Sequence, residues 1–287
     1  MTSTDRPVIA AVDGSSHSDE ALDWAAREAA RRGLGLTVVH ALTPDRPAER
    51  DARRREAEEL LDRSVRQVAR IAPELSPSTL APLDYPSAVL SSLSHNAALI
   101  VVGSRGLGGF RSLLLGSNSL AAASMADCPV VVVHSSRAEE EAPEDAEAPR
   151  DIVAGVAADE SSEAVLEFAF ETAASRPGAR LRIVHGWTMF SSMLSGGPVF
   201  DRDAAADAAA RALAELTAGW REKYPQVETV REPVSGSASR TLVTASATAA
   251  LTVIGRRRGG ESLGLGLSPV AQTTLTHALG PVAVVPC

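Results

Sequence analysis

Short apolar runs alternate along the chain with longer segments in which apolar residues recur every three or four positions. The first run, Val8–Val12, is almost continuously apolar, which is typical of a strand that helices cover on both faces. The next segment begins at a capping serine, Ser16 or Ser18, and carries its apolar residues on one helical stripe. The stripe consists of Ala21, Leu22, Trp24, Ala25 and Ala29. The pattern predicts a strand followed by an amphipathic helix.

The alternation continues through the first half of the chain. Further strands are predicted at Leu36–Ala41, weakly near Ser78–Leu83, and at Leu99–Val102 and Val130–Val133. Further helices are predicted at Arg50–Ile71, from Pro86 onward, and around Asn118–Met125. Strand and helix in regular alternation indicate a parallel sheet with helices on both faces. In such a fold, ligands bind outside the carboxyl ends of the strands.

The second half of the chain repeats the first. Matching segments share the same order and similar spacing: 97–103 with 249–255 and 128–133 with 280–285, both at an offset of 152, and 36–40 with 181–185. A chain of 287 residues is also about twice the usual length of one domain. The sequence therefore predicts a duplicated domain.

An acidic segment separates the two copies. Its acidic residues alternate with Ala and Pro: Glu139, Glu140, Glu141, Glu144, Asp145 and Glu147. Such a composition buries too little apolar area to offset the entropy lost on ordering. We interpret it as a linker, with a partner-binding acidic tail as the alternative. The expected organisation is a first domain at 1–135, the linker at 136–149 and a second domain at 150–287.

Composition and charge narrow the possible functions. The chain is 45% apolar and only 3% aromatic, so packed cores must consist of Val, Leu, Ile and Ala. The formal charge of −8 argues against nucleic acid as a ligand. The two cysteines form neither a disulfide framework nor a zinc-spaced cluster. With no signal peptide and no membrane-spanning run, a cytoplasmic location is expected.

Candidate chemistry follows two strand ends of the first copy. Val12-Asp13-Gly14-Ser15 places a carboxylate after the first strand. Gly103-Ser104-Arg105-Gly106 follows the fourth strand, and nine residues later Gly116-Ser117-Asn118-Ser119 opens a helix. Glycines allow close backbone approach, and free amides at a helix N-terminus favour phosphate oxygens. No P-loop, G-x-G-x-x-G or G-x-S-x-G motif is present, so no catalytic residue and no metal ligand is predicted.

The pattern G-x2-G-x9-G-S after a valine-rich strand, paired with V-D-G-S, resembles the nucleotide-binding signature of the universal stress protein family. The resemblance extends to Trp24–Ala29 and Cys128–Val133 and covers nearly all of both copies, like a tandem two-domain member. It implies an α/β fold of two Rossmann-like, doubly wound domains. Each would hold a five-stranded parallel sheet in the order 3-2-1-4-5.

The resemblance also implies that ATP, accompanied by a divalent cation such as Mg²⁺, binds to the first copy. Asp13 would lie beside the ribose and adenine, and Val12 and Ala41 would line the adenine slot with backbone groups. The remaining positions would contact the ribose and phosphates (Gly103, Arg105 and Gly106) or hold the phosphate tail (Gly116, Ser117, Asn118 and Ser119).

The second copy departs from this signature. At the offset of 144 that fits the first strand, Ala157 stands where the first copy has Asp13. At the later offset the replacements are Arg258 for Gly106, Ser268 for Gly116, Pro269 for Ser117 and Ala271 for Ser119. Proline has no amide proton to donate, and an arginine blocks close backbone approach although its charge attracts anions. We therefore predict weak or absent ATP binding in the second copy.

The hypothesis is an ATP-binding stress-response or signalling module. The alternatives are a slow ATPase or autophosphorylating enzyme, and a nucleotide-free interaction scaffold. The sequence leaves open whether AMP or cyclic AMP competes with ATP, and which regulatory protein is the partner.

Several segments keep more than one interpretation. Trp187–Phe200 is a flap, a contact surface or a buried loop, and Arg256–Arg258 is an anion clamp or a solvated basic turn. His40 and His185 occupy equivalent strand ends, which favours a structural role. Because an unpaired apolar edge strand is an aggregation hazard, we expect 130–133 to pair with 282–285 as an intrachain pseudo-dimer. A homodimer of full chains is also expected.

Overall fold

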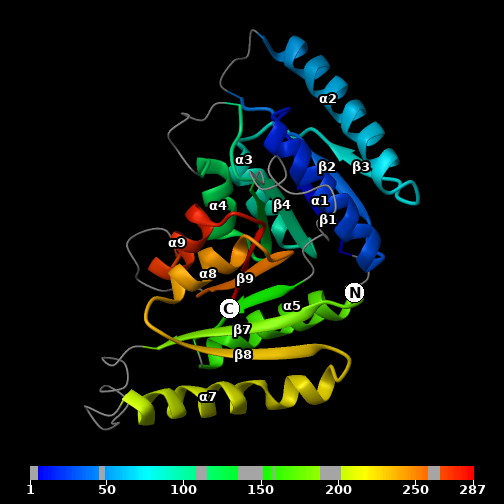
Figure 1. Ribbon diagram of the computed structural model, residues 1–287. Coiled ribbons are helices and arrows are strands. Elements are labelled where there is room, and N and C mark those ends of the chain that lie inside the picture. The colour runs from blue at the N-terminus through cyan, green and yellow to red at the C-terminus, as the bar shows by residue number, and fades with distance from the viewer. Residues whose placement is uncertain are drawn as a thin grey trace. The chain divides into compact units, whose positions relative to one another are not determined.

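The structure, a computed structural model, describes residues 6–44, 49–107, 115–134, 151–157, 159–187, 202–257 and 266–287 (Figure 1). The chain divides into two compact units, Met1–Ser135 and Ser136–Cys287. The proposed linker at 136–149 lies outside the described residues, so its assignment stays a prediction. No helix of the described residues is both long enough and apolar enough to cross a membrane.

The first unit alternates strands and helices along its whole length. Its elements are β1 (Val8–Ala11), α1 (Ser16–Arg32), β2 (Leu36–Val39), α2 (Arg50–Ile71), β3 (Ser78–Leu80), α3 (Pro86–Ser94), β4 (Leu99–Gly103), α4 (Ser117–Met125) and β5 (Val130–Val133). Its strands pair in parallel in the order β3-β2-β1-β4-β5. The predicted sheet order is therefore confirmed for this unit.

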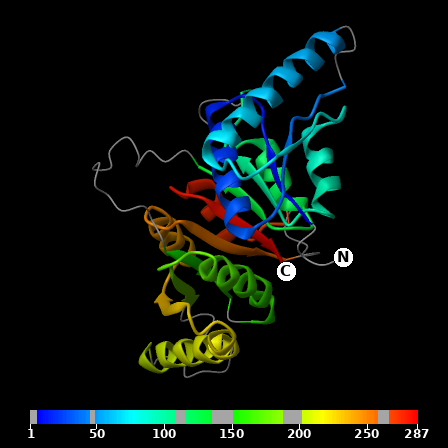
Figure 2. The same cartoon turned by 90° about the vertical axis from the view of Figure 1, so that its right-hand side faces the viewer.

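The two faces of the first sheet carry different helices. Helix α1 packs against β1 and β4 and contacts α2, whereas α3 and α4 contact each other (Figures 1 and 2). Strands β2, β4 and β5 are buried along their full length, as the continuous apolar runs predicted. The weak third strand ends at Leu80 rather than Leu83, because Pro82 has no N–H to donate to a ladder.

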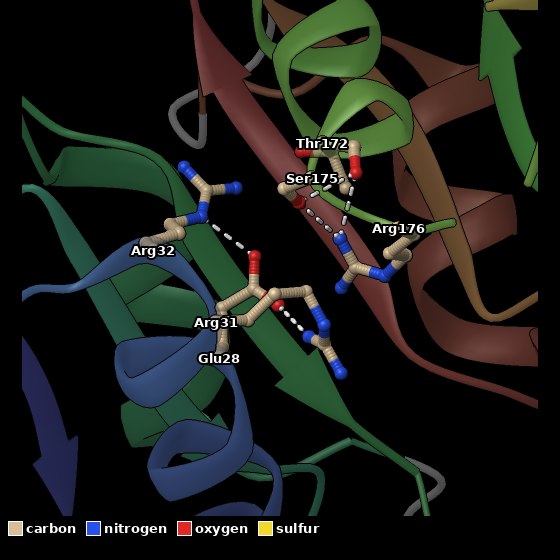
Figure 3. A network of polar contacts seen from close by, with 6 residues as sticks. All are labelled: Glu28, Arg31, Arg32, Thr172, Ser175 and Arg176. Atoms are coloured by element: carbon tan, nitrogen blue, oxygen red, sulfur yellow. Dashed lines mark hydrogen bonds and ion pairs between the residues drawn. The ribbon is translucent and has the colours of Figure 1, made fainter.

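Helix α1 has well-defined ends. Ser15 caps its N-terminus by accepting a hydrogen bond from the amide of Ser18, and Gly33 ends it in the left-handed conformation with φ of 64°. In its last turns, the fully buried carboxylate of Glu28 forms ion pairs with Arg31 at 2.5 Å and with Arg32 at 2.6 Å (Figure 3). The charge of Glu28 is thus compensated within the helix itself.

The second unit repeats this order. Its elements are β6 (Ile152–Gly155), the short 3-10 helix η3 (Glu160–Ser162), α5 (Glu163–Ala174), β7 (Arg180–Trp187), α7 (Arg202–Lys223), β8 (Glu228–Ser235), α8 (Ala238–Ser246), β9 (Leu251–Arg256), α9 (Pro269–His277) and β10 (Val282–Pro286). Its strands pair in parallel in the order β8-β7-β6-β9-β10. This is the order of the first unit, so the duplicated fold is confirmed.

Two local features distinguish the second unit. Arg176 follows the C-terminus of α5, and its guanidinium donates to the Thr172 carbonyl at 3.0 Å and lies 3.4 Å from the Ser175 hydroxyl (Figure 3). At the end of β7, Trp187 is buried against Ala205 and Ala209 of α7. The rest of the aromatic segment that follows Trp187 lies outside the described residues, so its role stays open.

Candidate functional site

A cavity of about 440 Å³ opens at the carboxyl ends of β1, β2 and β4 in the first unit. The architecture places it there because parallel strands end at one edge of the sheet, next to the N-termini of the helices that follow. All the residues predicted from the sequence line this one cavity: Val12, Asp13, Ala41, Gly103, Arg105, Gly106, Gly116, Ser117, Asn118 and Ser119. The structure thus brings together segments that are far apart along the chain.

Asp13 presents an ionised carboxylate at this cavity. Its Oδ1 accepts hydrogen bonds from the Ser15 amide at 3.0 Å and the Ser15 hydroxyl at 2.6 Å. Its Oδ2 accepts from the amide of Leu107, in the loop after β4, at 3.0 Å. Burial alone would raise the pKa of Asp13, but these hydrogen bonds outweigh burial and hold the pKa below its ordinary value of 3.8. The carboxylate is therefore a fixed negative acceptor at neutral pH.

The glycine positions of the signature are explained by close contacts. A Cβ on Gly106 would lie 2.3 Å from Oδ2 of Asp13, and a Cβ on Gly103 would lie 2.7 Å from the carbonyl oxygen of His17. Neither contact is tolerable without displacing the carboxylate or the first turn of α1. Gly116 is less crowded, with the Ser104 carbonyl oxygen 3.4 Å from its Cβ position. Gly106 is therefore the position at which any side chain most directly disturbs Asp13.

The opposite wall of the cavity is the N-terminus of α4. Gly116 is its N-cap, and no side chain of the described residues caps the amides that follow. Uncapped amides at a helix N-terminus attract anions. Arg105 also contributes a buried Nε that has no hydrogen-bond partner among the described residues. The Ser119 hydroxyl, expected as a further donor to a ligand, instead donates to the Gly103 carbonyl at 2.6 Å and ties α4 to β4.

The remaining part of the cavity is apolar. Its lining there consists of Val39, Ala41, Pro86, Val89 and Leu90. The backbone of Val12 is already in use, because its amide donates to the Val39 carbonyl at 2.9 Å. The Val12 carbonyl in turn lies 2.8 Å from Nδ1 of His40. Val12 therefore lines the cavity with an amide and a carbonyl that are already hydrogen-bonded, and this part of the cavity is an apolar slot.

The second unit confirms the structural interpretation of the paired histidines. Nδ1 of His185 lies 3.0 Å from the carbonyl oxygen of Val156, just as His40 contacts Val12. In each unit this contact joins the end of one strand to the end of its neighbour. Because a ring nitrogen facing a carbonyl must donate, the same tautomer is assigned to both histidines.

The carboxylate at the end of β1 also has a counterpart that the sequence comparison missed. Asp159 accepts from the amide of Ser161 at 3.0 Å and from the Ser161 hydroxyl, which reproduces the turn formed by Asp13 and Ser15. Asp159, and not Ala157, therefore has the role of Asp13. An insertion of two residues after β6 shifts the offset from 144 to 146. The repeated string D-x-S-S, at 13–16 and 159–162, was the signal that could have revealed it.

In the second unit, side chains of the protein itself hydrogen-bond to the counterparts of Asp13 and of the N-terminus of α4. The outer oxygen of Asp159 accepts from the Arg257 guanidinium at 2.6 Å, where Asp13 accepts from a backbone amide. Ser268 caps α9 by accepting from the Ala271 amide at 3.1 Å, and Pro269 follows it in the first turn. Arg257 is thus paired with a carboxylate, which weakens the anion-clamp interpretation at this residue. Arg258 lies outside the described residues.

In the second unit, helix α8 packs directly against the strand end that corresponds to the apolar slot. Gly186 is the next-to-last residue of β7 and occupies the position of Ala41, and α8 begins at Ala238 where α3 begins at Pro86. A Cβ on Gly186 would lie only 2.5 Å from the Cβ of Ala238. Backbone and helix therefore pack directly against each other at the place where the first unit has its cavity lining.

The parallel sheets and the repeated aspartate turn define a duplicated, doubly wound α/β protein, and comparison with known proteins identifies its family. The model of the universal stress protein family matches residues 6–134 and 149–286. The chain belongs to the universal stress protein family, as a tandem two-domain member.

Relatives of the same length support this assignment. The chain is 32% identical over 289 residues to universal stress protein Rv2623 of Mycobacterium tuberculosis H37Rv, covering 96% of this chain and 95% of the relative. It is 34% identical over 289 residues to universal stress protein Mb2028c of Mycobacterium bovis, covering 96% of each chain. A crystal structure of a universal stress protein from Archaeoglobus fulgidus shares the fold with a TM-score of 0.74, at 17% identity, covering 99% and 97% of the two chains.

Proposed function

We propose that the first domain binds ATP in the cavity at the ends of β1, β2 and β4, and that the protein is a nucleotide-binding stress-response module. The observation that carries the proposal is the combination found in one cavity: an apolar slot, a fixed carboxylate and an uncapped helix N-terminus. These three surfaces match the base, the ribose hydroxyls and the phosphates of a nucleotide. The volume also lies within the usual range of small-molecule sites, about 300–1,000 Å³.

The arrangement suggests one orientation for the nucleotide. The base would enter the slot between Ala41 and Val89, and the ribose hydroxyls would donate to the carboxylate of Asp13. The phosphates would then meet Arg105 and the first turn of α4. The buried Arg105 Nε supports this orientation, because a buried donor without a partner costs free energy until a ligand accepts from it.

The accompanying cation would arrive with the phosphates. Within the described ranges, no group of three or more His, Cys, Asp or Glu side chains could hold a metal ion. Mg²⁺ is commonly bound through substrate phosphates together with one or two carboxylates rather than by a protein cage. The cavity residues therefore fit Mg-ATP taken up as a unit, with the cation held by the phosphates.

We further propose that the second domain does not bind ATP under the same conditions. Its equivalent carboxylate is paired with Arg257, its helix α9 is capped by Ser268, and Gly186 packs against Ala238 at the position of the apolar slot. A cytoplasmic location, the edge-strand pairing between domains and a homodimer remain predictions.

Titration of the intact chain tests the proposal. A ligand at a hundredfold excess over its Kd stabilises the native state by about 2.7 kcal/mol, so Mg-ATP should raise the melting temperature of the wild type. The double variant Gly106→Arg and Gly116→Ser imports residues of the second domain and should lose this shift. The matched control is Gly219→Ser on α7, where nothing lies within 4 Å of the Cβ position. Equal shifts in all three proteins would refute the site.

A further inference from the structure

A second hollow of the first domain lies outside the nucleotide cavity. It is an open groove of about 720 Å³, lined by Gly14 and Asp19 near the start of α1 and otherwise by residues of α2. Three arginines, Arg63, Arg66 and Arg70, line it from α2. No step of nucleotide binding uses these arginines.

The three arginines point along one side of their helix. Their spacing of three and then four residues places them on one face. All three are exposed, and none forms a hydrogen bond or ion pair with another residue in the described part of the chain. Burial and the Asp23 carboxylate raise the pKa of Asp19 across the groove, and the charge of Arg63 partly opposes this rise. Arg63, Arg66 and Arg70 therefore form a cationic row with unused donors.

The floor beneath this row is fixed. Leu60 and Ser64 are buried, and the Ser64 hydroxyl donates to the Leu60 carbonyl at 3.0 Å. The side-chain amide of Gln67 donates to the Asp19 carbonyl at 3.0 Å and to the Asp23 carboxylate at 2.6 Å, which joins α2 to α1. A ligand would thus meet a preformed surface and would order only the arginine side chains.

We propose that this groove binds an acidic peptide segment of a partner protein in an extended conformation. Guanidinium groups pair with carboxylates in a bidentate manner, and an unpaired arginine row is unusual on a chain of net charge −8. Alternate side chains of an extended peptide lie about 7 Å apart on one side, within reach of arginines that rise about 4.5–6 Å from one to the next. The open shape suits a chain rather than an enclosed ion, and three cations on an acidic protein are too few for a nucleic acid.

Fluorescence anisotropy with a labelled peptide tests this assignment. The probe is fluorescein-Glu-Ala-Glu-Ala-Glu-Ala-Glu, titrated with the full-length protein at low salt. Wild type should bind it, and Arg63→Gln with Arg66→Gln and Arg70→Gln should weaken binding at least tenfold. The control carries the same charge change elsewhere, with Arg50→Gln, Arg55→Gln and Arg211→Gln, all exposed. It should bind within about twofold of wild type.

The possible results distinguish a partner peptide in the groove from bulk electrostatic attraction and from the chain's own acidic segment. Equal weakening in the two triple variants would show bulk electrostatics and overturn the proposal, as would no binding by the wild type. A further variant replaces the acidic residues between 139 and 147 by Gln or Asn. If only that variant binds the peptide tightly, the chain's own acidic segment fills the groove, and the assignment to a partner protein is wrong. Circular dichroism before each titration verifies that the variants are folded.

Discussion

At the ends of β1 and β6, the two domains build the same turn around an aspartate, yet they use it differently. Asp13 receives backbone and serine donors and faces a cavity, whereas Asp159 is paired with the guanidinium of Arg257. The helix that follows the glycine loop is uncapped in the first domain and capped by Ser268 in the second. Duplication thus preserved the framework while the second copy came to satisfy its polar groups internally. The difference shows that an intact fold does not guarantee an open site.

We expect the largest effect from Ser117→Pro, which gives the first domain the proline of the second domain and should lower its affinity for ATP. Gly116 already has the extended conformation, with ψ of 148°, that a following proline requires, and α9 begins with Pro269 in the same way. The variant should fold normally but lose one amide donor at the phosphate end. ATP affinity should fall about tenfold, or about 1.4 kcal/mol, while adenosine affinity changes little, as measured by titration calorimetry.

Pro269→Ser in the second domain is the matched control and should leave ATP affinity unchanged. A loss of adenosine binding as large as the loss of ATP binding would contradict the assigned orientation. Unchanged ATP affinity in Ser117→Pro would show that the phosphates do not bind at the N-terminus of α4.

A smaller effect, on the free energy of unfolding, is expected from Asp13→Asn, and this effect should depend on pH. The folded-state pKa of Asp13 lies below its ordinary value of 3.8, so the carboxylate contributes stability at pH values above 3.8. That contribution is lost as the pH falls below 3.8 and through the folded-state pKa. At pH 7 the variant should be less stable by about 1 kcal/mol, allowing for solvent screening of a partly exposed group.

Urea unfolding at pH 7, 5 and 3 measures this difference. The gap between wild type and Asp13→Asn should narrow at pH 3, and the exposed substitution Asp62→Asn should show no comparable narrowing. A gap that stays constant across these pH values would mean that the carboxylate charge does not stabilise the first domain.

The smallest effect on the free energy of unfolding is expected from Arg257→Gln in the second domain. The two side chains of its ion pair with Asp159 are 67% and 44% exposed, so its loss should cost less than about 1 kcal/mol. In a chain that also carries Gly106→Arg and Gly116→Ser, this variant should give no heat with ATP, because Gly186 still packs against Ala238. Heat from ATP in that chain would show that the ion pair alone closes the second site.

Much of the first site could be predicted from the sequence because the parallel architecture is regular. Once strands and helices alternate, the residues after β1 and β4 must meet at one edge of the sheet, whatever the details of packing. Asp13, Gly106 and Gly116 were found in this way. The use of the Ser119 hydroxyl within the protein was not predictable, because it depends on how closely α4 approaches β4.

The amino-acid sequence alone determined the duplication and the order of the elements, since these follow from periodicity and from local backbone preferences. The set of residues around the first cavity came from the resemblance of the sequence to the universal stress protein family. Only the tertiary structure revealed Asp159 as the counterpart of Asp13, the close contact of Gly186 with Ala238, and the arginine row between α1 and α2. These features join groups that are distant along the chain, as Asp159 and Arg257 are. Their contacts depend on distances of a few ångströms, which a two-residue insertion changes and a local pattern does not record.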